Sequence, residues 1–304
     1  MHTAPLRIGT FTRSLLLDVA RAAGHLEHAG IDVVEGSVPS SPAQFSALVA
    51  GELDIVLTSP DNVLAYRFLS GNPLGENLPV QIIAAIDRGL GLSLCTAPPL
   101  ASVEAVRGQI VGVDVPQSGF AFVAFELLAR AGLSSGDYAV ESLGSTPRRA
   151  EALIAGDCSA TVLNAGNELR GVAAGCHVVS RACDIGPYLG TVLAALTTTD
   201  PAIEERREHL AEALLATSRE ILDGRWETEV IDAATRLLGL SAAEAADHRA
   251  CLMDPAQGLI GSGAVDADSV STLIELRRRH RPTPELDLVE ASWPSLLTGP
   301  ARGV

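Results

Sequence analysis

The hydrophobic and polar positions of the chain follow the same order twice, in residues 47–62 and again in residues 152–167. Each segment starts with the end of a helical pattern, passes a glycine and an acidic residue, and continues as a short apolar run before small polar residues. The glycines, Gly51 and Gly156, stand where a left-handed backbone commonly ends a helix. The apolar runs predict buried parallel strands, so the chain is expected to contain two similar α/β units.

The start of each repeated helix is also visible in the sequence. Ser41 is predicted as the N-cap of the first helix, with Pro42 at the first helical position and Gln44 completing a capping box. Thr146 and Pro147 take the same two places in the second helix. Each helix is therefore expected to run from its cap to its glycine.

The rest of the pattern completes two units of the same design. A strand, a polar loop and a helix span residues 6–29, and the same order returns in residues 108–131. The first of these helices is predicted to be continuous over residues 15–29. Further strands are predicted at 31–35, 54–57, 80–86, 92–96, 139–143, 160–163, 177–180 and 191–196, and further helices at 63–69, 200–223, 228–238, from 241 onward and at 266–279.

Two crossings of the chain between the units are predicted, near Asp87 and near Ile185. They divide the protein into one lobe of residues 1–86 with 189–304 and a second lobe of residues 87–188. The expected fold class is α/β, with two lobes, two crossings between them and a C-terminal helical tail that packs mainly on the first lobe.

Small polar side chains follow the repeated apolar runs. Asp61 and Asn62 come after the first run, and Asn164 and Asn167 come after the second. Ligands of open α/β sheets bind beyond the carboxyl ends of the strands. The sequence therefore predicts a ligand site where these loops meet.

Two predicted helix starts add donors to this site. Thr12 and Arg13 precede a helix of the first unit, and Gln117, Ser118 and Gly119 open one in the second. The free N–H groups and the positive dipole end of a helix start favour an anion. We expect these two starts to face each other across the cleft.

Charged side chains near the crossings leave alternatives open. Arg13 and Arg88 could each hold a carboxylate or sulfonate, or could pair with Asp61 or Asp87 across the hinge. The two acids could serve as a general acid or base if burial shifts the pKa of either, or could make structural hydrogen bonds. Catalytic residues are not assigned.

No metal or cofactor is expected. His25 and His28 lie three positions apart with no third ligand spaced near them, which favours a solvated helix face. Gly89 and Gly91 lack the third glycine and the following helix of a dinucleotide fingerprint.

Composition narrows the partners. The net charge of the 304 residues is −15, which argues against nucleic acid and anionic membrane surfaces as partners. All 22 basic residues are arginine, so chemistry that needs a lysine is excluded. No apolar run is long enough to cross a membrane, so no membrane insertion is expected.

The cysteines and the first residues bear on the compartment. The five cysteines form no C-x-x-C pair and are odd in number, which favours free thiols in a reducing compartment. No pattern typical of an export signal precedes the strand at residues 6–10. A cytoplasmic location is therefore expected.

The chain resembles the type 2 periplasmic-binding-protein-like family, in particular its sulfonate, nitrate and taurine branch, which includes the thiamine-pyrimidine synthase. Residues 47–54, 108–113, 117–119 and 152–157 carry the resemblance, which covers roughly residues 6–295. It implies a ligand held between two lobes that close about the crossings. The residues that it places in the cleft are Thr10, Phe11, Thr12, Arg13, Ser37, Ser59, Asp61, Asn62, Asp87, Arg88, Gln117, Ser118, Gly119, Ser145, Thr146, Asn164, Asn167 and Tyr188.

The resemblance implies two functions. One is a solute-binding protein of the ABC-transporter type that holds a small anionic or aromatic organic molecule, with an ABC permease as partner if the chain is exported. The other is a cytoplasmic metal-independent enzyme on the same scaffold, acting on a small organic acid or aromatic as a lyase, decarboxylase, dehydratase or hydrolase. The related desulfinase uses a cysteine in its first strand–helix loop, where this chain has Phe11, Thr12 and Arg13. The cysteine cluster of the pyrimidine synthase has no counterpart here.

Overall fold

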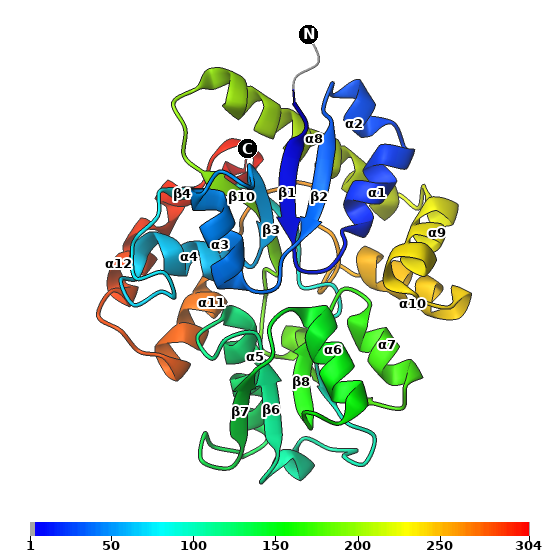
Figure 1. Cartoon of the computed structure of the whole chain (residues 1–304), viewed down its shortest axis with the longest axis vertical. Helices are drawn as coiled ribbons and strands as arrows, with labels where there is room; N and C mark the ends of the chain where they lie inside the picture. The colour runs from blue at the N-terminus through cyan, green and yellow to red at the C-terminus, as the bar shows by residue number, and fades with distance from the viewer. Residues whose placement is uncertain (1–3, 304) are drawn as a thin grey trace.

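The first of two five-stranded sheets lies in the upper part of the molecule in Figure 1. The computed structural model describes residues 4–303. The strand order is β2-β1-β3-β10-β4, with β1, β2 and β3 parallel and β10 antiparallel to both β3 and β4. The strands are β1 Leu6–Thr10, β2 Val33–Ser37, β3 Ile55–Thr58, β4 Val80–Asp87 and β10 Thr191–Leu196.

The second sheet, in the lower part of Figure 1, repeats this design. Its order is β7-β6-β8-β5-β9, with β6, β7 and β8 parallel and β5 antiparallel to both β8 and β9. The predicted pair of similar α/β units is thus confirmed at the level of sheet order. The strands are β5 Ser93–Thr96, β6 Ile110–Val113, β7 Ala139–Ser142, β8 Ala160–Leu163 and β9 His177–Arg181.

The chain passes between the sheets twice, from β4 to β5 and from β9 back to β10. These passages include the predicted crossing points at Asp87 and Ile185. We keep residues 1–86 with 189–304 and residues 87–188 as the proposed division, and name them the first and the second lobe.

The repeated helices are α3 Ser41–Val49 and α6 Thr146–Ala155. The predicted caps at Ser41 and Thr146 are wrong by one residue, because Ser40 and Ser145 hold the N-cap positions. The capping box is also wrong: the Gln44 amide points into the core and donates to two strand carbonyls. The glycines behave as predicted, with φ of 67° at Gly51 and 84° at Gly156.

Two other helices differ from their predicted bounds, and a third, α7, was not predicted. The predicted helix at 15–29 is two helices, α1 Leu15–Ala22 and α2 His25–His28, because Gly24 adopts a φ of 76° between them. α4 is Pro60–Phe68, so Asp61 and Asn62 lie in its first turn and not in a loop. α7 is Asn167–Ala173, which likewise places Asn167 in a first turn. The remaining helix of the second lobe is α5 Gly119–Arg130, and short 3₁₀ turns lie at Glu104–Val106 and Ala182–Asp184.

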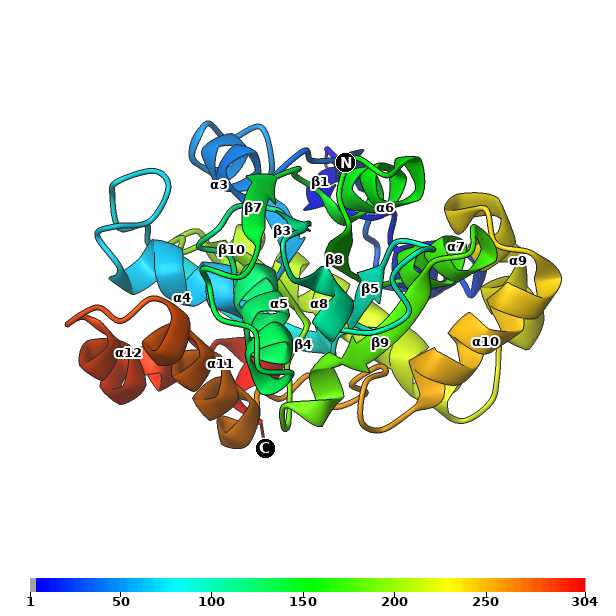
Figure 2. The same ribbon diagram turned by 90° about the horizontal axis from the view of Figure 1, so that it is seen from below.

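The chain after β10 is helical, as predicted, but its helices do not share one place. α8 Pro201–Leu222 and α9 Glu227–Leu238 pack on α1, and α10 Ala242–Met253 packs on α8 and α9. α11 Ala267–His280 instead lies beside α5 of the second lobe, as Figures 1 and 2 both show. α12 Leu286–Ser292 follows it and contacts α4, and 3₁₀ turns at Trp293–Leu296 and Gly299–Arg302 end the chain.

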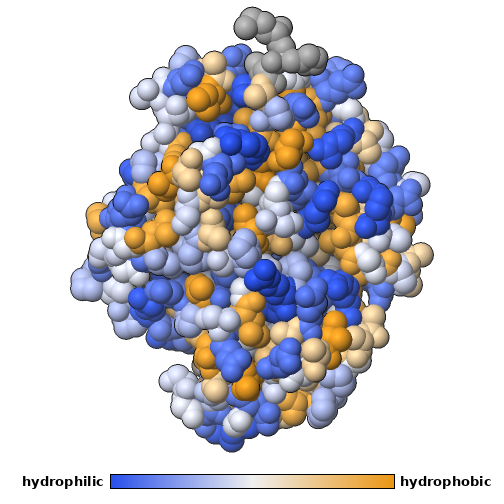
Figure 3. Space-filling model, viewed as in Figure 1, coloured by the Kyte–Doolittle hydropathy of each residue, from blue (hydrophilic) through white to orange (hydrophobic). Residues whose placement is uncertain are grey.

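Apolar packing joins the lobes as well as filling each of them. One buried cluster runs from Val56 and Ile82 of the first sheet through Leu92 and Tyr188 to Val111 of the second sheet. Hydrophobic residues are scattered among hydrophilic ones over the face seen in Figure 3. Among the described residues, no helix combines the length and the apolar character that a membrane span requires.

Candidate functional site

A cavity of about 120 Å³ lies between the lobes, where the parallel strands of both sheets end. The β1–α1, β3–α4 and β6–α5 loops and the start of α6 contribute its polar wall. The structure brings twelve of the predicted residues to this wall: Thr10, Phe11, Thr12, Arg13, Ser59, Asn62, Asp87, Ser118, Gly119, Ser145, Thr146 and Asn164.

The other six predicted residues lie outside the cavity wall. Two serve as bridges between segments: Arg88 pairs with Asp266 at 3.1 Å, and the Asn167 amide donates to the Thr12 hydroxyl across the lobes at 3.3 Å. Asp61 is buried in an ion pair. The remaining three are Ser37, which is exposed at the end of β2, Gln117, which lines a separate hollow beside α11, and Tyr188, which is buried in the core between the lobes.

Sequence reasoning missed the apolar part of the cavity. It is formed by leucines of α1, by residues near the first crossing and by side chains of the C-terminal tail, which carries no motif. Arg149 and Asp114 were also missed, although Arg149 occupies in α6 the place that Gln44 has in α3. The missed residues are Ser14, Leu15, Leu16, Leu57, Thr58, Ile86, Leu90, Asp114, Phe120, Arg149, Ala165, Gly190, Thr191, Leu238, His248, Leu252 and Leu259.

Four helices begin at the cavity, each with a serine at its N-cap. The hydroxyls of Ser14, Ser59 and Ser118 accept hydrogen bonds from backbone N–H groups of their own helices, at 3.2–3.3 Å. Ser145 makes no such side-chain bond to α6. Three of the four hydroxyls are thus engaged in capping.

The start of α1 is already met by a carboxylate of the protein. Glu35 of β2 accepts hydrogen bonds from the Ser14 N–H at 2.7 Å and from the Thr10 hydroxyl at 2.8 Å. Arg13 pairs with Glu35 at 3.3 Å, and its side chain is 53% exposed. Neither Asp61 nor Asp87 is its partner, and its charge is directed to an internal anion.

The start of α5 is met by a carboxylate as well. A Cβ at Gly119 would stand 2.9 Å from Oδ2 of Asp61, so only a glycine permits this approach. Arg277 of α11 donates to both carboxylate oxygens of Asp61 from its Nε and Nη2 atoms, with Nη2 to Oδ2 at 2.8 Å, and both side chains are nearly inaccessible. Burial raises the pKa of Asp61, while Arg277 and the Gly119 N–H oppose that shift.

Two further buried charges of the wall are Arg149, which is engaged, and Asp114, whose Oδ1 atom has no hydrogen-bond partner among residues 4–303. Arg149 donates to the Gly144 and Val162 carbonyls and to the hydroxyls of Thr161 and Thr146. Burial lowers its pKa to about 10, and the nearby Asp114 acts in the opposite direction. Burial raises the pKa of Asp114, while the Arg149 charge and then hydrogen bonds from Ser41 at the start of α3 oppose that rise.

Asp87 ends β4 at the first crossing. Its carboxylate accepts a hydrogen bond from the Gly89 N–H at 2.8 Å. Burial raises the pKa of Asp87 to about 6, against hydrogen bonds from Thr191 and Gly89. This carboxyl therefore changes its protonation state close to neutral pH.

The side of the cavity formed by the C-terminal tail is apolar except for one imidazole. Leu238 of α9 and Leu252 of α10 flank His248, which is 1% exposed. The Nδ1 atom of His248 is buried without a hydrogen-bond partner among residues 4–303. Burial lowers the pKa of His248 to about 4, so the ring is neutral at physiological pH.

Comparison with known proteins gives matches in structure and none in sequence. No family model and no curated protein matches the chain. Among solved structures, the alkanesulfonate-binding protein of Xanthomonas axonopodis pv. citri, bound to MOPS, superposes with a TM-score of 0.75 at 16% identity, covering 98% of this chain and 99% of that one. The periplasmic nitrate-binding protein of Synechocystis PCC 6803 gives 0.72 at 12%, covering 98% and 92%. The chain has the type 2 periplasmic-binding-protein fold.

This periplasmic-binding-protein fold also carries enzymes. The desulfurization enzyme DSZB matches with a TM-score of 0.64 at 14% identity, covering 95% of this chain and 96% of that one. At such identities the matches establish the fold and leave the ligand and the chemistry open.

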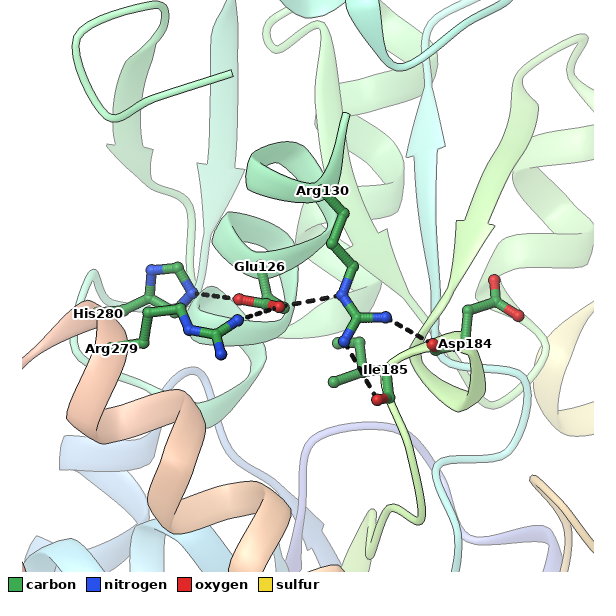
Figure 4. A network of polar contacts seen from close by, with 6 residues as sticks. All are labelled: Glu126, Arg130, Asp184, Ile185, Arg279 and His280. Atoms are coloured by element: carbon green, nitrogen blue, oxygen red, sulfur yellow. Dashed lines mark hydrogen bonds and ion pairs between the residues drawn. The ribbon is translucent and has the colours of Figure 1, made fainter. Parts of the chain in front are cut away.

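The first and the second lobe are in direct contact at more than one place. The Ser145 N–H donates to the Pro39 carbonyl at 3.0 Å. Figure 4 shows a further contact, in which Glu126 of α5 lies between Arg130 and the α11 residues Arg279 and His280.

The same network reaches the second crossing. Arg130 donates to the carbonyl oxygens of Asp184 at 2.7 Å and of Ile185 at 3.2 Å. One set of polar contacts therefore connects α11 of the C-terminal tail, α5 of the second lobe and the second crossing.

Proposed function

We propose that this chain is a solute-binding protein that encloses a small organic molecule in the cavity between its lobes. The observation that carries the proposal is the cavity itself, which both lobes line at the carboxyl ends of their parallel strands. Neighbours of the same fold include ligand-binding components of ABC-type import systems. An ABC permease is the corresponding partner if the chain is exported.

The wall supports a ligand with an apolar body. Leu15, Leu16, Leu90 and the leucines of α9 and α10 cover one part of the cavity, while Phe11 and Phe120 contribute aromatic surface. Of the two ligand classes expected from the sequence, the aromatic class matches this composition directly.

Native mass spectrometry of the protein purified from a cell extract tests the proposal. We expect a bound small molecule that is absent from Leu15→Trp, a variant in which a larger side chain fills the cavity from α1. A folded Leu15→Trp protein that retains the same molecule would place the ligand elsewhere.

A second candidate function is a metal-independent enzyme, and Asp87 is the observation that favours it. A carboxyl with a pKa of about 6 in a cavity wall is suited to transfer a proton near neutral pH. Asp87→Asn separates the two functions. If the chain is an enzyme, the wild type converts the bound molecule and Asp87→Asn binds it without converting it. If the chain is a solute-binding protein, neither form converts the molecule.

The cytosol remains the proposed location, supported by the thiols. All five cysteines are free, and Cys95, Cys158 and Cys176 are buried in one cluster of the second lobe. This arrangement suits a reducing compartment. Neighbours named as periplasmic proteins point the other way, and fractionation of cells that express the full-length protein decides between the compartments.

A further inference from the structure

The anion positions that a helix start provides are occupied by the protein itself at two sides of the cavity. Glu35 accepts the Ser14 N–H at the start of α1, and Asp61 lies against Gly119 at the start of α5. A carboxylate or sulfonate entering either place would meet an existing negative charge. The donors that would favour an anion there are already engaged.

The arginines of the wall do not restore a site for an anion. The Arg149 guanidinium donates to four oxygens of the second lobe, so each of its three nitrogens is already engaged by the protein. Arg13 is paired with Glu35. The acids Asp87 and Asp114 lie on the same wall as these two arginines, so positive and negative side chains are equal in number there.

A different polar group in the wall has no partner. His248 is almost fully buried and lines the cavity, and its Nδ1 atom has no hydrogen-bond partner within residues 4–303. An unpartnered buried polar group costs about 1–3 kcal/mol, which a ligand's donor or acceptor would recover. Because the imidazole is neutral, it can donate from one nitrogen and accept at the other.

The position of His248 separates it from Asp61 of α4, which fills the start of α5, whereas α1 lies on the same side as His248 and packs on α9. His248 lies on α10, which Figures 1 and 2 both show on the opposite side of the molecule from α4. Apolar side chains surround it, since Leu238 and Leu252 belong to the same part of the wall. The cavity thus offers apolar surface around one buried imidazole whose Nδ1 atom has no partner among residues 4–303.

We propose that the cavity takes an uncharged organic molecule with an apolar body and one hydrogen-bonding group that contacts His248, and that it rejects the corresponding carboxylate or sulfonate. This inference rests on the proposed function, because it specifies the ligand of the same cavity. The proposed ligand is uncharged, whereas the neighbours of the same fold are named as binding alkanesulfonate and nitrate, which are anions.

Matched pairs of small aromatic probes test the charge preference. Each pair joins an acid to its uncharged isostere: benzoate with benzamide, phenylacetate with phenylacetamide, and benzenesulfonate with benzenesulfonamide. Calorimetry or saturation-transfer NMR on the wild-type protein should show the uncharged member of a binding pair bound about tenfold or more tightly than the anion, since the internal carboxylates Glu35 and Asp61 already hold the donors at the starts of α1 and α5 and would repel an anion there.

Two sets of variants test the assigned residues. His248→Leu should weaken the uncharged probe about threefold to tenfold, whereas His248→Gln, which keeps a donor and an acceptor, should recover most of that loss. Glu35→Gln removes the internal anion at α1 and frees Arg13. The variant should therefore bind the anionic probe severalfold more tightly and the amide about as tightly as the wild type does, which reduces the preference for the uncharged probe.

The outcomes distinguish the inference from the function on which it rests. An anion bound as tightly as its isostere, or an amide indifferent to both His248 variants, overturns the inference and leaves a solute-binding protein. Probes that bind a folded Leu15→Trp as they bind the wild type, or no binding by any pair, count against the proposed function and the inference together.

Discussion

The second position of α4 and the second position of α7 both carry a buried acid, yet the two acids lie in different surroundings. Asp61 follows Ser59 and Pro60 in the first lobe, and Glu168 follows Gly166 and Asn167 in the second. Asp61 is held by the Arg277 guanidinium. Oε2 of Glu168 has no hydrogen-bond partner among residues 4–303.

The source of the difference is the C-terminal tail. α11 passes beside α5 and α4 and carries Arg277 to Asp61. At α7 the tail contributes α10, which brings the Cys251 thiol near Glu168 and no positive charge. A Cβ at Gly91 would come within 2.9 Å of Oε1 of Glu168, so the carboxyl is closely surrounded. The repeated lobe design therefore supplies the acid, and the unrepeated tail determines whether that acid has a counter-charge.

The largest effect is expected from breaking the paired copy. Arg277→Ala leaves Asp61 buried without its partner and should lower the free energy of unfolding by roughly 3–5 kcal/mol in urea denaturation. Arg278→Ala is the matched control, because Arg278 is the next residue of α11 and pairs with Glu275 and Glu290 at the surface. Its loss should cost about 1 kcal/mol or less.

A double variant sharpens this test. Asp61→Leu combined with Arg277→Leu removes both charges and should be less destabilising than Arg277→Ala alone, since no unpaired charge remains. If Arg277→Ala and Arg278→Ala unfold at the same urea concentration, the ion pair does not distinguish α4 from α7.

Much of the lobe design was predictable, and the comparison explains the limit. The repeated glycines and apolar runs predicted two matching units, because local backbone preference and burial pattern act over neighbouring residues. The equivalent roles of Gln44 and Arg149 could have been found by aligning the two copies. Gln44 bonds the Leu57 carbonyl, and Arg149 bonds the Val162 carbonyl at the corresponding strand position.

The occupants of the cavity wall were not predictable in this way. The contacts of Glu35 with Ser14, of Arg277 with Asp61 and of α10 with the cavity join segments that are distant or unrepeated in sequence. A helix start signals available donors, but it does not show which carboxylate the fold brings to them. For this reason the two helix starts that the sequence predicted as a site for an anionic ligand are occupied by carboxylates of the protein itself.

Glu168, the acid without a counter-charge from the tail, should make the stability of the protein depend on pH. Burial raises the pKa of Glu168 from 4.5 to about 8, with Arg181 and backbone N–H groups opposing that rise. Between these values the folded protein holds a proton that the unfolded chain has released, so stability falls as pH rises from about 4.5 to about 8. Glu168→Gln removes the ionisable group and should flatten this part of the profile.

The size of that response follows from the shift, at about 1.4 kcal/mol per pKa unit, so a gain of a few kcal/mol at pH 9 is expected for Glu168→Gln over the wild type. Denaturation at pH 5, 7 and 9 measures it. Glu151→Gln, on the exposed face of α6, serves as the control and should change stability by under about 0.5 kcal/mol. Parallel pH profiles of Glu168→Gln and the wild type would show that Glu168 is ionised in the fold.

The smallest expected effect tests what the copies share. Gly51 and Gly156 both adopt positive φ, at 67° and 84°, and a Cβ at either position meets no atom within 4 Å. Gly51→Ala and Gly156→Ala should therefore each cost about 1 kcal/mol, from backbone strain alone. Because neither glycine contacts the tail, the two losses should agree within about 0.5 kcal/mol and add in the double variant. Unequal losses in urea denaturation would mean that the ends of α3 and α6 differ in more than their sequence, and the tail could then no longer be the sole source of the difference between Asp61 and Glu168.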